Sequence, residues 1–317
     1  MPGTEPQIVV VGSHAPGLFI RVRRVPVAGE TVIGWDFEEP KDGGKGSNQA
    51  IAAARLGVPT SFVGCIGKDR LGTEIDSWLK EEGVDINYLY TSNSKRTGVG
   101  FIILNENGVP AMVTSMGANE ELNCEQVDTA LAGSEDAKVL LTQFEILPEV
   151  ALYAARVAKD YHMITIVNPA PASAMSLSNL EVADILVPND SEARVLLGMD
   201  SQSNIDLETL AKELMTRTKA KSVIITAGEH GMIGVDRAGV WQVLPPKVEV
   251  VDTSGAGDVF CAALAVGLVK GLNCRLASEW ANTVATLSVT KKGTISSFPF
   301  AVEVDEFESR ISRTNQM

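Results

Sequence analysis

The chain has 317 residues, of which 45% are hydrophobic, and its formal net charge at pH 7 is −13. This length and apolar content can bury one large core with a small appendage. A strongly acidic chain lacks the concentrated Lys and Arg that bind phosphate backbones or anionic lipid surfaces, which argues against nucleic-acid and membrane partners. No run of about 18 apolar residues and no signal-peptide pattern is present, so we expect a cytoplasmic protein.

Short β-branched runs alternate with segments of helical periodicity, a pattern typical of α/β proteins with a mainly parallel sheet. The nearly continuous hydrophobicity of the runs indicates that helices cover both faces of the sheet. The predicted strands are 8–11, 61–65, 139–142, 164–168, 185–187 and 223–226. One predicted helix begins near Ser47, a second runs over 71–82, and a third follows Asp258 and ends at Gly271.

Two regions interrupt this alternation, at about 17–40 and 97–115. The second contains GVGFIILNENGVPAMVTS, which predicts two strands joined by a turn at Asn107–Gly108. We expect the two regions to form a separate small sheet that covers a pocket, within a single domain spanning 1–317.

The four cysteines do not suggest a metal site or a disulfide framework. Cys65, Cys124, Cys261 and Cys274 show no CxxC spacing and lie in apolar or helical contexts. We therefore expect buried free thiols.

The motif DTSGAGD at 252–258 carries the strongest chemical signal, because it joins a β-like run to a strongly apolar helix. Its glycines allow tight turning, and the helix N-terminus directs unpaired N–H groups and a positive dipole end at one point. That geometry suits an anion or a developing phosphoryl charge, and the Asp258 carboxylate at the same point can accept a proton from an attacking hydroxyl. On glycine spacing alone, a plain strand-to-helix connection is the alternative.

The motif DGGKGSNQ at 42–49 opens another predicted helix. Its glycines let the backbone approach a ligand, while Lys45 and Asn48 supply polar groups suited to hydroxyl recognition. The GxxxxGK[ST] spacing of a P-loop is absent, so Lys45 is not predicted to cradle phosphate. A helix cap is the alternative interpretation and is compatible with ligand binding.

Three further polar segments directly follow predicted strands. They are NPAP at 168–171, PNDSE at 188–192 and TAGEHG at 226–231. Open α/β sheets bind ligands at the carboxyl ends of their strands, so these loops can converge on one crevice. Asn-Asp-Ser is also ordinary helix-capping chemistry.

Taken together and in order, these segments resemble the PfkB carbohydrate kinase family and its ribokinase branch. The likeness runs from VVVGS through GGKGSNQA, NPAP and PNDSE to DTSGAGD and VTKKGTISS, which is nearly the whole chain. It implies a three-layer ribokinase-like α/β fold with a small β-sheet lid. It also implies transfer of the γ-phosphoryl group of ATP to a hydroxyl, often a primary alcohol, of a small sugar. Lid strands of the family often pair across a two-fold axis, so we expect a homodimer formed through them.

The resemblance assigns roles to individual positions. Asp258 matches the catalytic base, and the matching anion hole is Gly255, Ala256 and Gly257. The positions that match sugar contacts are Gly43, Gly44, Lys45, Asn48 and Glu145. The positions that match nucleotide contacts are Asn189, Thr226, Gly228, Gly231, Gly257 and Asn282. Glu192 matches a carboxylate that helps to hold Mg²⁺. The positions that match a monovalent-cation site, and predict K⁺ activation, are Asp252, Ser254, Ser288, Lys291, Gly293 and Ser297.

One position departs from the pattern. Ribokinases usually carry an Asp soon after the first strand, in a stretch like GSxNxD, whereas residues 12–17 are GSHAPG and place Gly17 there. Losing a carboxylate partner costs about 1.5–3 kcal/mol per charged hydrogen bond, so we hypothesise a sugar other than free ribose, or a modified or acidic sugar. Phe19, Arg21 and Arg23 share one face of the next predicted strand. If that face meets the pocket, Arg21 can bind a substrate carboxylate or phosphate and His14 can add a hydrogen bond; otherwise the arginines form a solvated surface.

Three functional alternatives stay open: ribokinase proper acting on D-ribose, a nucleoside kinase, and a catalytically idle sugar-binding or regulatory protein on the same fold. The GGKGxNQ pattern favours the ribokinase branch over nucleoside kinases. Retention of Asp258 with its glycines argues against the idle protein. The absence of GxGxxG after the first strand disfavours a dehydrogenase.

Overall fold

Strands and helices alternate along most of the chain, as the changes of hydrophobic period predict. The computed structural model describes residues 5–39, 43–107, 110–173, 175–200 and 203–314. Asp42 of the second glycine motif, Gly108 of the predicted turn and residue 40 of the first lid segment lie outside them.

Within the described residues, the main sheet has nine strands in the order β13-β12-β11-β10-β9-β8-β1-β4-β5. The parallel strands are β1 (Ile8–Val11), β4 (Thr60–Gly67), β5 (Leu89–Ser92), β8 (Val139–Gln143), β9 (Ile164–Asn168), β10 (Ile185–Leu186) and β11 (Ser222–Thr226). At one end of the sheet, β12 (Met232–Asp236) pairs antiparallel with β11, and the edge strand β13 (Gly239–Val243) pairs antiparallel with β12. The prediction of a mainly parallel sheet is confirmed, although β5, β12 and β13 were not among the predicted strands.

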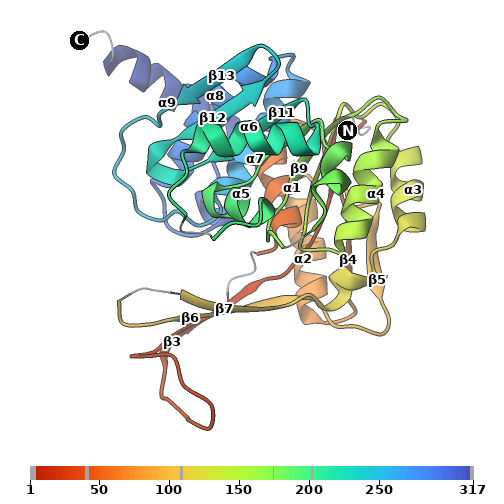
Figure 1. Cartoon of the computed structure of the whole chain (residues 1–317). Helices are drawn as coiled ribbons and strands as arrows, with labels where there is room; N and C mark the ends of the chain where they lie inside the picture. Colours follow the sequence, from red (N-terminus) through yellow and green to blue (C-terminus); the bar gives the residue numbers. More distant parts are fainter. Residues whose placement is uncertain (1–4, 40–42, 108–109, 174, 201–202, 315–317) are drawn as a thin grey trace.

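Helices cover both faces of this sheet, which gives the three predicted layers (Figure 1). Alternate strand residues point to opposite layers: Ile8 and Val10 pack in one buried cluster, Val9 and Val11 in the other. The first cluster is covered by α1 (Lys45–Arg55), α2 (Arg70–Glu81), α7 (Ala256–Val269), α8 (Cys274–Ser288) and α9 (Ala301–Thr314). The second is covered by α3 (Cys124–Ala132), α4 (Pro148–Ala158), α5 (Asp190–Leu196) and α6 (Leu207–Thr218). Short 3₁₀ helices are η1 (Gly117–Glu121), η2 (Leu177–Val182), η3 (Gly228–His230) and η4 (Ile295–Ser297).

The predicted helices begin close to the expected residues. Helix α7 is apolar around its whole circumference because all of its sides are buried. It packs against α1 and α8 as well as against the strands β8, β1 and β9. In α2, Ile75 and Leu79 are buried, and Gly83 follows with a φ of 77°. That positive φ supplies the predicted stop, since glycine adopts it without steric cost.

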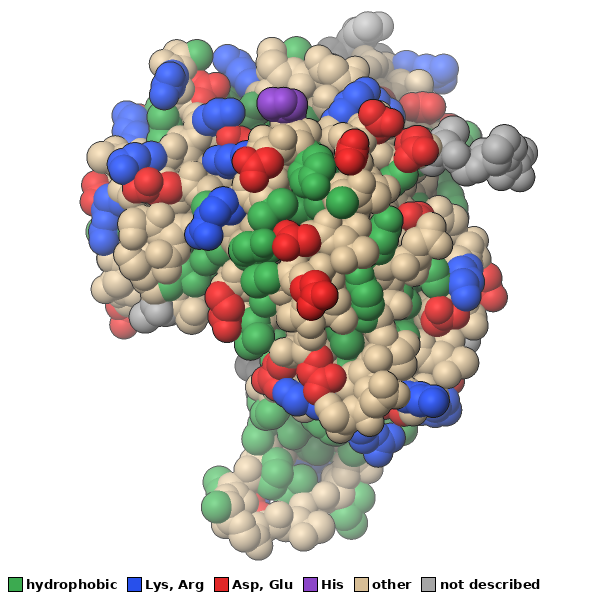
Figure 2. Space-filling model, turned by 90° about the vertical axis from the view of Figure 1, so that its right-hand side faces the viewer, with side chains coloured by type: hydrophobic (Ala, Val, Ile, Leu, Met, Phe, Trp, Pro, Cys, Tyr) green, Lys and Arg blue, Asp and Glu red, His purple; other side chains and the backbone are tan. Residues whose placement is uncertain are grey.

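A separate sheet of β3 (Trp35–Glu38), β2 (Gly17–Arg21), β6 (Val99–Leu104) and β7 (Pro110–Ser115), in that order, projects from the body (Figure 1). Here β2 pairs with β6 in parallel, and the other pairs are antiparallel. This lid sheet confirms the expected small sheet. Figure 2 shows hydrophobic side chains on the surface of the projecting lobe.

All four cysteines are free, and two of them depart from the expected burial. Cys65 and Cys261 are buried, whereas Cys124 and Cys274 are partly exposed because each is the first residue of a helix. Among the described residues, no helix has both the length and the apolar character that crossing a membrane requires.

Candidate active site

The motif segments meet at the carboxyl edge of the parallel strands. The segment after β1 contacts the second glycine motif, where a Cβ on Gly43 would lie 2.3 Å from the Ala15 carbonyl oxygen. Glu145, beyond β8, binds the start of α1 through the backbone N–H of Lys45 at 2.8 Å. The loops after β10 and β11 are joined by a bridge between Asn189 and Thr226. The convergence expected from strand ends therefore occurs.

Asp258 lies in the first turn of α7 and is 6% exposed. Its two carboxylate oxygens accept hydrogen bonds from consecutive residues of α1: Oδ2 from Asn48 Nδ2 at 2.9 Å, and Oδ1 from Gln49 Nε2 at 3.0 Å. Gly255, just before the helix, has a φ of 75°, and an added Cβ would lie 2.7 Å from the side chains of Phe298 and Thr294. Glycine is therefore required at this position, both for the backbone angle and for the space.

Lys45 brings a positive charge to the same point. Burial disfavours its charged form, but the charges of Asp258, Glu145 and Glu192 outweigh that effect and raise the pKa of Lys45. The ammonium is therefore protonated across the physiological range. Glu145 Oε2 also accepts a hydrogen bond from the Ser13 hydroxyl at 2.7 Å, which ties the β1 loop to α1.

The environment of Glu192 suits a cation. Burial raises its pKa, and the Asp258 charge acts in the same direction, while a hydrogen bond from the Asn189 backbone N–H and the charge of Lys45 oppose the shift. A metal ion would offset the same burial cost. The described residues contain no group of three or more His, Cys, Asp or Glu side chains that could hold a metal.

His14 is 1% exposed and lies under the start of α1, where its Nδ1 is 3.0 Å from the Ser47 hydroxyl oxygen. Burial lowers the pKa of His14 to about 3, so the imidazole is neutral at pH 7. Its Nε2 has no hydrogen-bond partner among the described residues. Its backbone N–H donates to Asn119 Oδ1 at 2.9 Å, which fixes the loop.

Gly17 is the first residue of β2, and the space beside it is occupied by apolar groups. A Cβ built there would lie 2.9 Å from both the Phe19 ring and Ile102 Cδ1. The surface beside Gly17 is thus hydrophobic, without a carboxylate. Arg21, at the far end of β2, is exposed, and its Nε is 3.8 Å from a carboxylate oxygen of Asp36.

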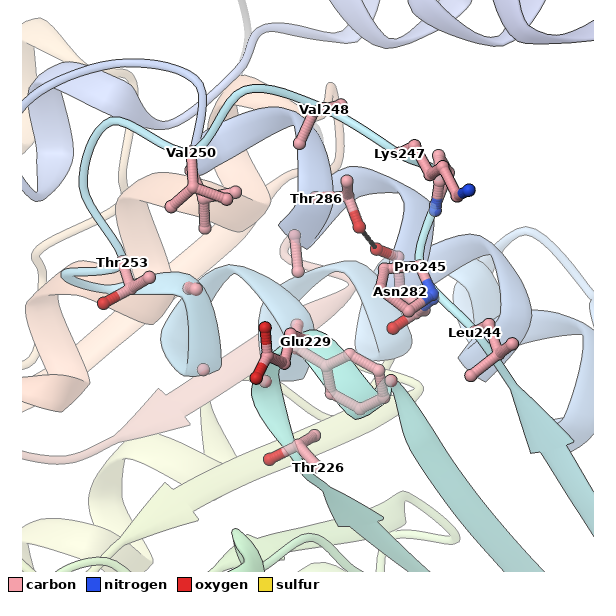
Figure 3. A pocket seen from close by; sticks show the side chains of 18 residues that line it. Thr226, Glu229, Leu244, Pro245, Lys247, Val248, Val250, Thr253, Asn282 and Thr286 are labelled. Atoms are coloured by element: carbon pink, nitrogen blue, oxygen red, sulfur yellow. Dashed lines mark hydrogen bonds between the residues drawn. The ribbon is translucent and has the colours of Figure 1, made fainter.

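A cavity of about 940 Å³ lies beside the start of α7, between the loop after β11 and helix α8 (Figure 3). Its lining is largely apolar and includes Val248, Phe260 and Val289. The predicted nucleotide positions that line it are Thr226, Gly228, Gly231, Gly257 and Asn282. Asn282 is 7% exposed, and its Nδ2 has no hydrogen-bond partner among the described residues. Asn189 caps α5 near this cavity and is not part of its lining.

The predicted monovalent-cation positions lie in two segments that Asp252 joins: the segment that leads into α7, and the segment from the end of α8 to η4. Asp252 Oδ1 accepts a hydrogen bond from the Ser254 N–H, and its Oδ2 accepts one from the Gly293 N–H, both at 2.9 Å. Partial burial acts to raise the pKa of Asp252, but these hydrogen bonds help to lower it overall. Ser288 and Ser297 are buried, with hydroxyls donating to Ala285 and Thr294 carbonyls. The Lys291 ammonium pairs with Glu303. A cation contact from Lys291 would therefore use its carbonyl oxygen.

Sequence reasoning missed three polar residues of this site: Ser13, Gln49 and Gln143. Gln49 is the last letter of GGKGSNQ and contacts Asp258, yet adjacency to Asn48 was the only available signal. Gln143 is the last residue of β8, every residue of which is buried, so its position gave no signal of a role in the site.

Comparison with known proteins identifies the family of this chain. The family model for pfkB family carbohydrate kinases matches residues 7–301, so the chain belongs to that family. It is a carbohydrate kinase by class. Within the class, it is 36% identical to the ribokinase of Bacillus subtilis, over 95% of this chain and 99% of that protein. It is 35% identical to the ribokinase of Schizosaccharomyces pombe, over 94% and 96% of the two chains. A solved structure of Arabidopsis thaliana ribokinase with ribose and ATP superposes with a TM-score of 0.87, at 30% identity over 96% of this chain and 99% of that one.

Proposed function

We propose that the chain is an ATP-dependent sugar kinase that transfers the γ-phosphoryl group of ATP to a hydroxyl of a small sugar, and that this hydroxyl is a primary alcohol. The observation that carries this proposal is the position of Asp258. Its buried carboxylate lies at the N-terminus of α7. The cavity, which is large enough for a nucleotide, lies on one side of it, and Asn48 of the second glycine motif lies on the other.

In this proposal, Asp258 accepts the proton of the attacking hydroxyl as that oxygen bonds to phosphorus. The N-terminus of α7 at Gly255, Ala256 and Gly257 stabilises the charge on the transferred group. A Cβ on Gly257 would meet no atom within 4 Å, so this turn has room for a phosphoryl group. The protonated Lys45 adds positive charge at the same place. Phosphoryl transfer depends mainly on such positioning and charge stabilisation.

The sugar would bind Gly43, Gly44, Asn48 and Glu145. Asn48 Oδ1 is buried and has no hydrogen-bond partner among the described residues, so it can accept a hydrogen bond from a sugar hydroxyl. The hydrophobic surface of Phe19 and Ile102 beside Gly17 supports a sugar other than free ribose. D-ribose remains the second candidate, because the similar relatives are ribokinases.

ATP would occupy the cavity beside α7, as its position near Asp258 and its apolar lining suit a nucleobase. Asn282 Nδ2 supplies an unpaired donor for a ring nitrogen. The Arabidopsis relative that shares this fold was solved with ATP and ribose.

Two cations fit the residues present. Glu192 would help to hold Mg²⁺ through water, which suits an ion that keeps several water ligands and needs no dedicated protein cage. The two segments joined by Asp252 would hold K⁺ through carbonyl and hydroxyl oxygens of the predicted monovalent-cation positions. Mg²⁺ would neutralise phosphate charge, and K⁺ would stabilise the loop that leads into α7.

A homodimer formed through the lid sheet is also part of this proposal. Exposed hydrophobic side chains gather on the lid strands, at Trp35, Phe37, Phe101, Met112 and Val113. Met112 and Val113 are consecutive in β7 and point to opposite faces, so both faces of the lid sheet expose apolar side chains, which favour contact with a second copy. Light scattering on the purified protein would show a mass near 67 kDa, twice the 33.7 kDa of the chain, for the expected dimer. The cytoplasm, where ATP is available, is the compartment consistent with this activity.

The test is an ATP-dependent phosphorylation assay over pentoses, hexoses, deoxy sugars, sugar acids and nucleosides, with Mg²⁺ and with or without K⁺. Turnover of a sugar supports the kinase, and the identity of the best substrate decides between ribose and the alternative. Turnover of nucleosides alone would support a nucleoside kinase. Sugar binding without turnover of any compound would contradict the proposal and favour an idle binding protein.

A further inference from the structure

Two buried glutamines stand behind the carboxylate of Asp258, and none of the roles above uses them. Gln49 of α1 and Gln143 at the end of β8 are both 0% exposed. Gln49 Nε2 donates to Asp258 Oδ1 at 3.0 Å, and Gln49 Oε1 accepts from Gln143 Nε2. A hydrogen-bonded chain therefore connects the central sheet to the carboxylate.

The orientation of the Gln49 amide is determined by its neighbours. Asn168 Nδ2 donates to the Val187 carbonyl at 2.7 Å, so Asn168 Oδ1 is turned toward Gln49 Nε2, 3.4 Å away. The donor group of Gln49 faces two oxygens, and its acceptor faces a donor. A reversed amide would place Oε1 against both oxygens in a region without solvent, where unpaired polar atoms are costly.

The position of Gln143 is itself enforced by packing. A Cβ on Gly12 would lie 2.2 Å from Gln143 Oε1, so glycine makes room for this side chain. Gln143 also pairs in register with Asn168 on the neighbouring parallel strand. The chain of amides thus stands on two adjacent strands at the centre of the sheet, a rigid support.

We propose that Gln49 is a positioning residue that holds Oδ1 of Asp258, and that Gln143 acts through Gln49 by keeping its amide in the donating orientation. This inference rests on the proposed kinase function. With Oδ1 held from behind, the carboxylate cannot rotate freely. Its Oδ2, on the side of Asn48, then remains directed at the substrate hydroxyl. Loss of this support would affect the transition state more than substrate binding.

The test uses methionine, which has nearly the length and volume of glutamine but donates no hydrogen bond. Gln49→Met, Gln143→Met and the double variant are assayed with ATP and the sugar that the unaltered protein phosphorylates fastest. We expect Gln49→Met to lower kcat about 10- to 100-fold, the factor for losing a hydrogen bond to a charged group, with KM for both substrates within about twofold. Gln143→Met lowers kcat about 3- to 10-fold, as for a neutral hydrogen bond. The double variant is no slower than Gln49→Met, because both changes act through one contact.

Thr142→Val is the matched control. Thr142 is fully buried next to Gln143, and its hydroxyl donates to the Val11 carbonyl at 2.8 Å, away from Asp258. This variant loses a buried hydrogen bond on the same strand, so the melting temperature falls while kcat stays within about twofold. A Gln49→Met kcat within twofold of the unaltered protein, or effects that multiply in the double variant, would overturn the proposal. If Gln49→Met does not fold, Gln143→Met decides alone, since it leaves every atom that touches Asp258 in place. Absence of turnover in the unaltered protein would instead refute the kinase function.

Discussion

Arg55 connects three separate segments of the chain at the end of α1. Its Nε and Nη2 donate to the two carboxylate oxygens of Glu82 at 2.7 and 2.6 Å. Its Nη1 donates to the carbonyls of Ile295 and Phe298, and the guanidinium lies 4.7 Å from the centre of the Phe300 ring. The side chains of Arg55 and Glu82 are only 11% and 13% exposed. We predict that Arg55→Ala is among the most destabilising single changes in this chain.

The loss of stability on Arg55→Ala follows from the groups that lose their partner. Glu82 keeps a hydrogen bond from Trp78 Nε1 at 3.2 Å, but its charge loses the partner, and two carbonyls lose a donor. Removing one partner of a buried ion pair costs about 3–5 kcal/mol. The unfolding entropy of a chain this long is about 0.7 kcal/mol per kelvin, so the melting temperature should fall by about 4–7 °C.

Differential scanning calorimetry measures this shift, with Arg70→Ala as the control. Arg70 also pairs with two carboxylates, of Glu39 and Glu74, but its side chain is 59% exposed. Its removal should change the melting temperature by less than about 2 °C. Replacing Arg55 and Glu82 together by methionine should recover part of the loss, because no buried charge is left unpaired. Equal shifts for Arg55→Ala and Arg70→Ala would refute the reasoning.

Three further predictions concern the site. Gly255→Ala should cut kcat at least tenfold, because its φ of 75° and the 2.7 Å approach of Phe298 force the start of α7 to move; a normal steady-state kcat would contradict this. Asn282→Leu should raise KM for ATP about 2- to 10-fold without changing KM for the sugar, and an unchanged KM for ATP would remove Asn282 from nucleotide recognition. His14 has a folded-state pKa of about 3 against an ordinary value of 6.5, so below pH 6.5 the unfolded chain binds a proton that the folded protein does not. Burial of neutral His14 therefore costs no stability above pH 6.5. Below that pH, the free energy of unfolding should fall by about 1.4 kcal/mol per pH unit toward pH 4, relative to that of His14→Leu, as measured by urea unfolding. Parallel pH profiles of the two proteins would count against this assignment.

Much of the architecture was predictable where burial is simple, although the buried strand β12 was not predicted. Strands such as β1 are fully buried, so their continuous hydrophobic runs mark them in the sequence. The strands β5 and β13 lie at the two edges of the sheet and are partly exposed, which weakens the same signal.

The site was predictable only where a motif carries chemistry. Asp258 and Asn48 were expected to share a site, and a 2.9 Å hydrogen bond joins them. Gln143 and Arg55 could not be expected, because their partners are 94 and 27 residues away and neither lies in a motif. Long-range pairing of buried polar groups depends on the register of the folded sheet, which spacing along one chain does not specify.

The central claim is that Asp258 is the base of a phosphoryl transfer to a sugar, and one comparison tests it most directly. Turnover is measured for the unaltered protein, for Asp258→Asn, and for Asp305→Asn on the exposed side of α9 as control, with calorimetric binding of ATP to each. We predict that Asp258→Asn lowers kcat about 10²- to 10⁴-fold, the usual contribution of a general base, while ATP binding and the control activity are retained. A kcat for Asp258→Asn within tenfold of the unaltered protein would contradict the account.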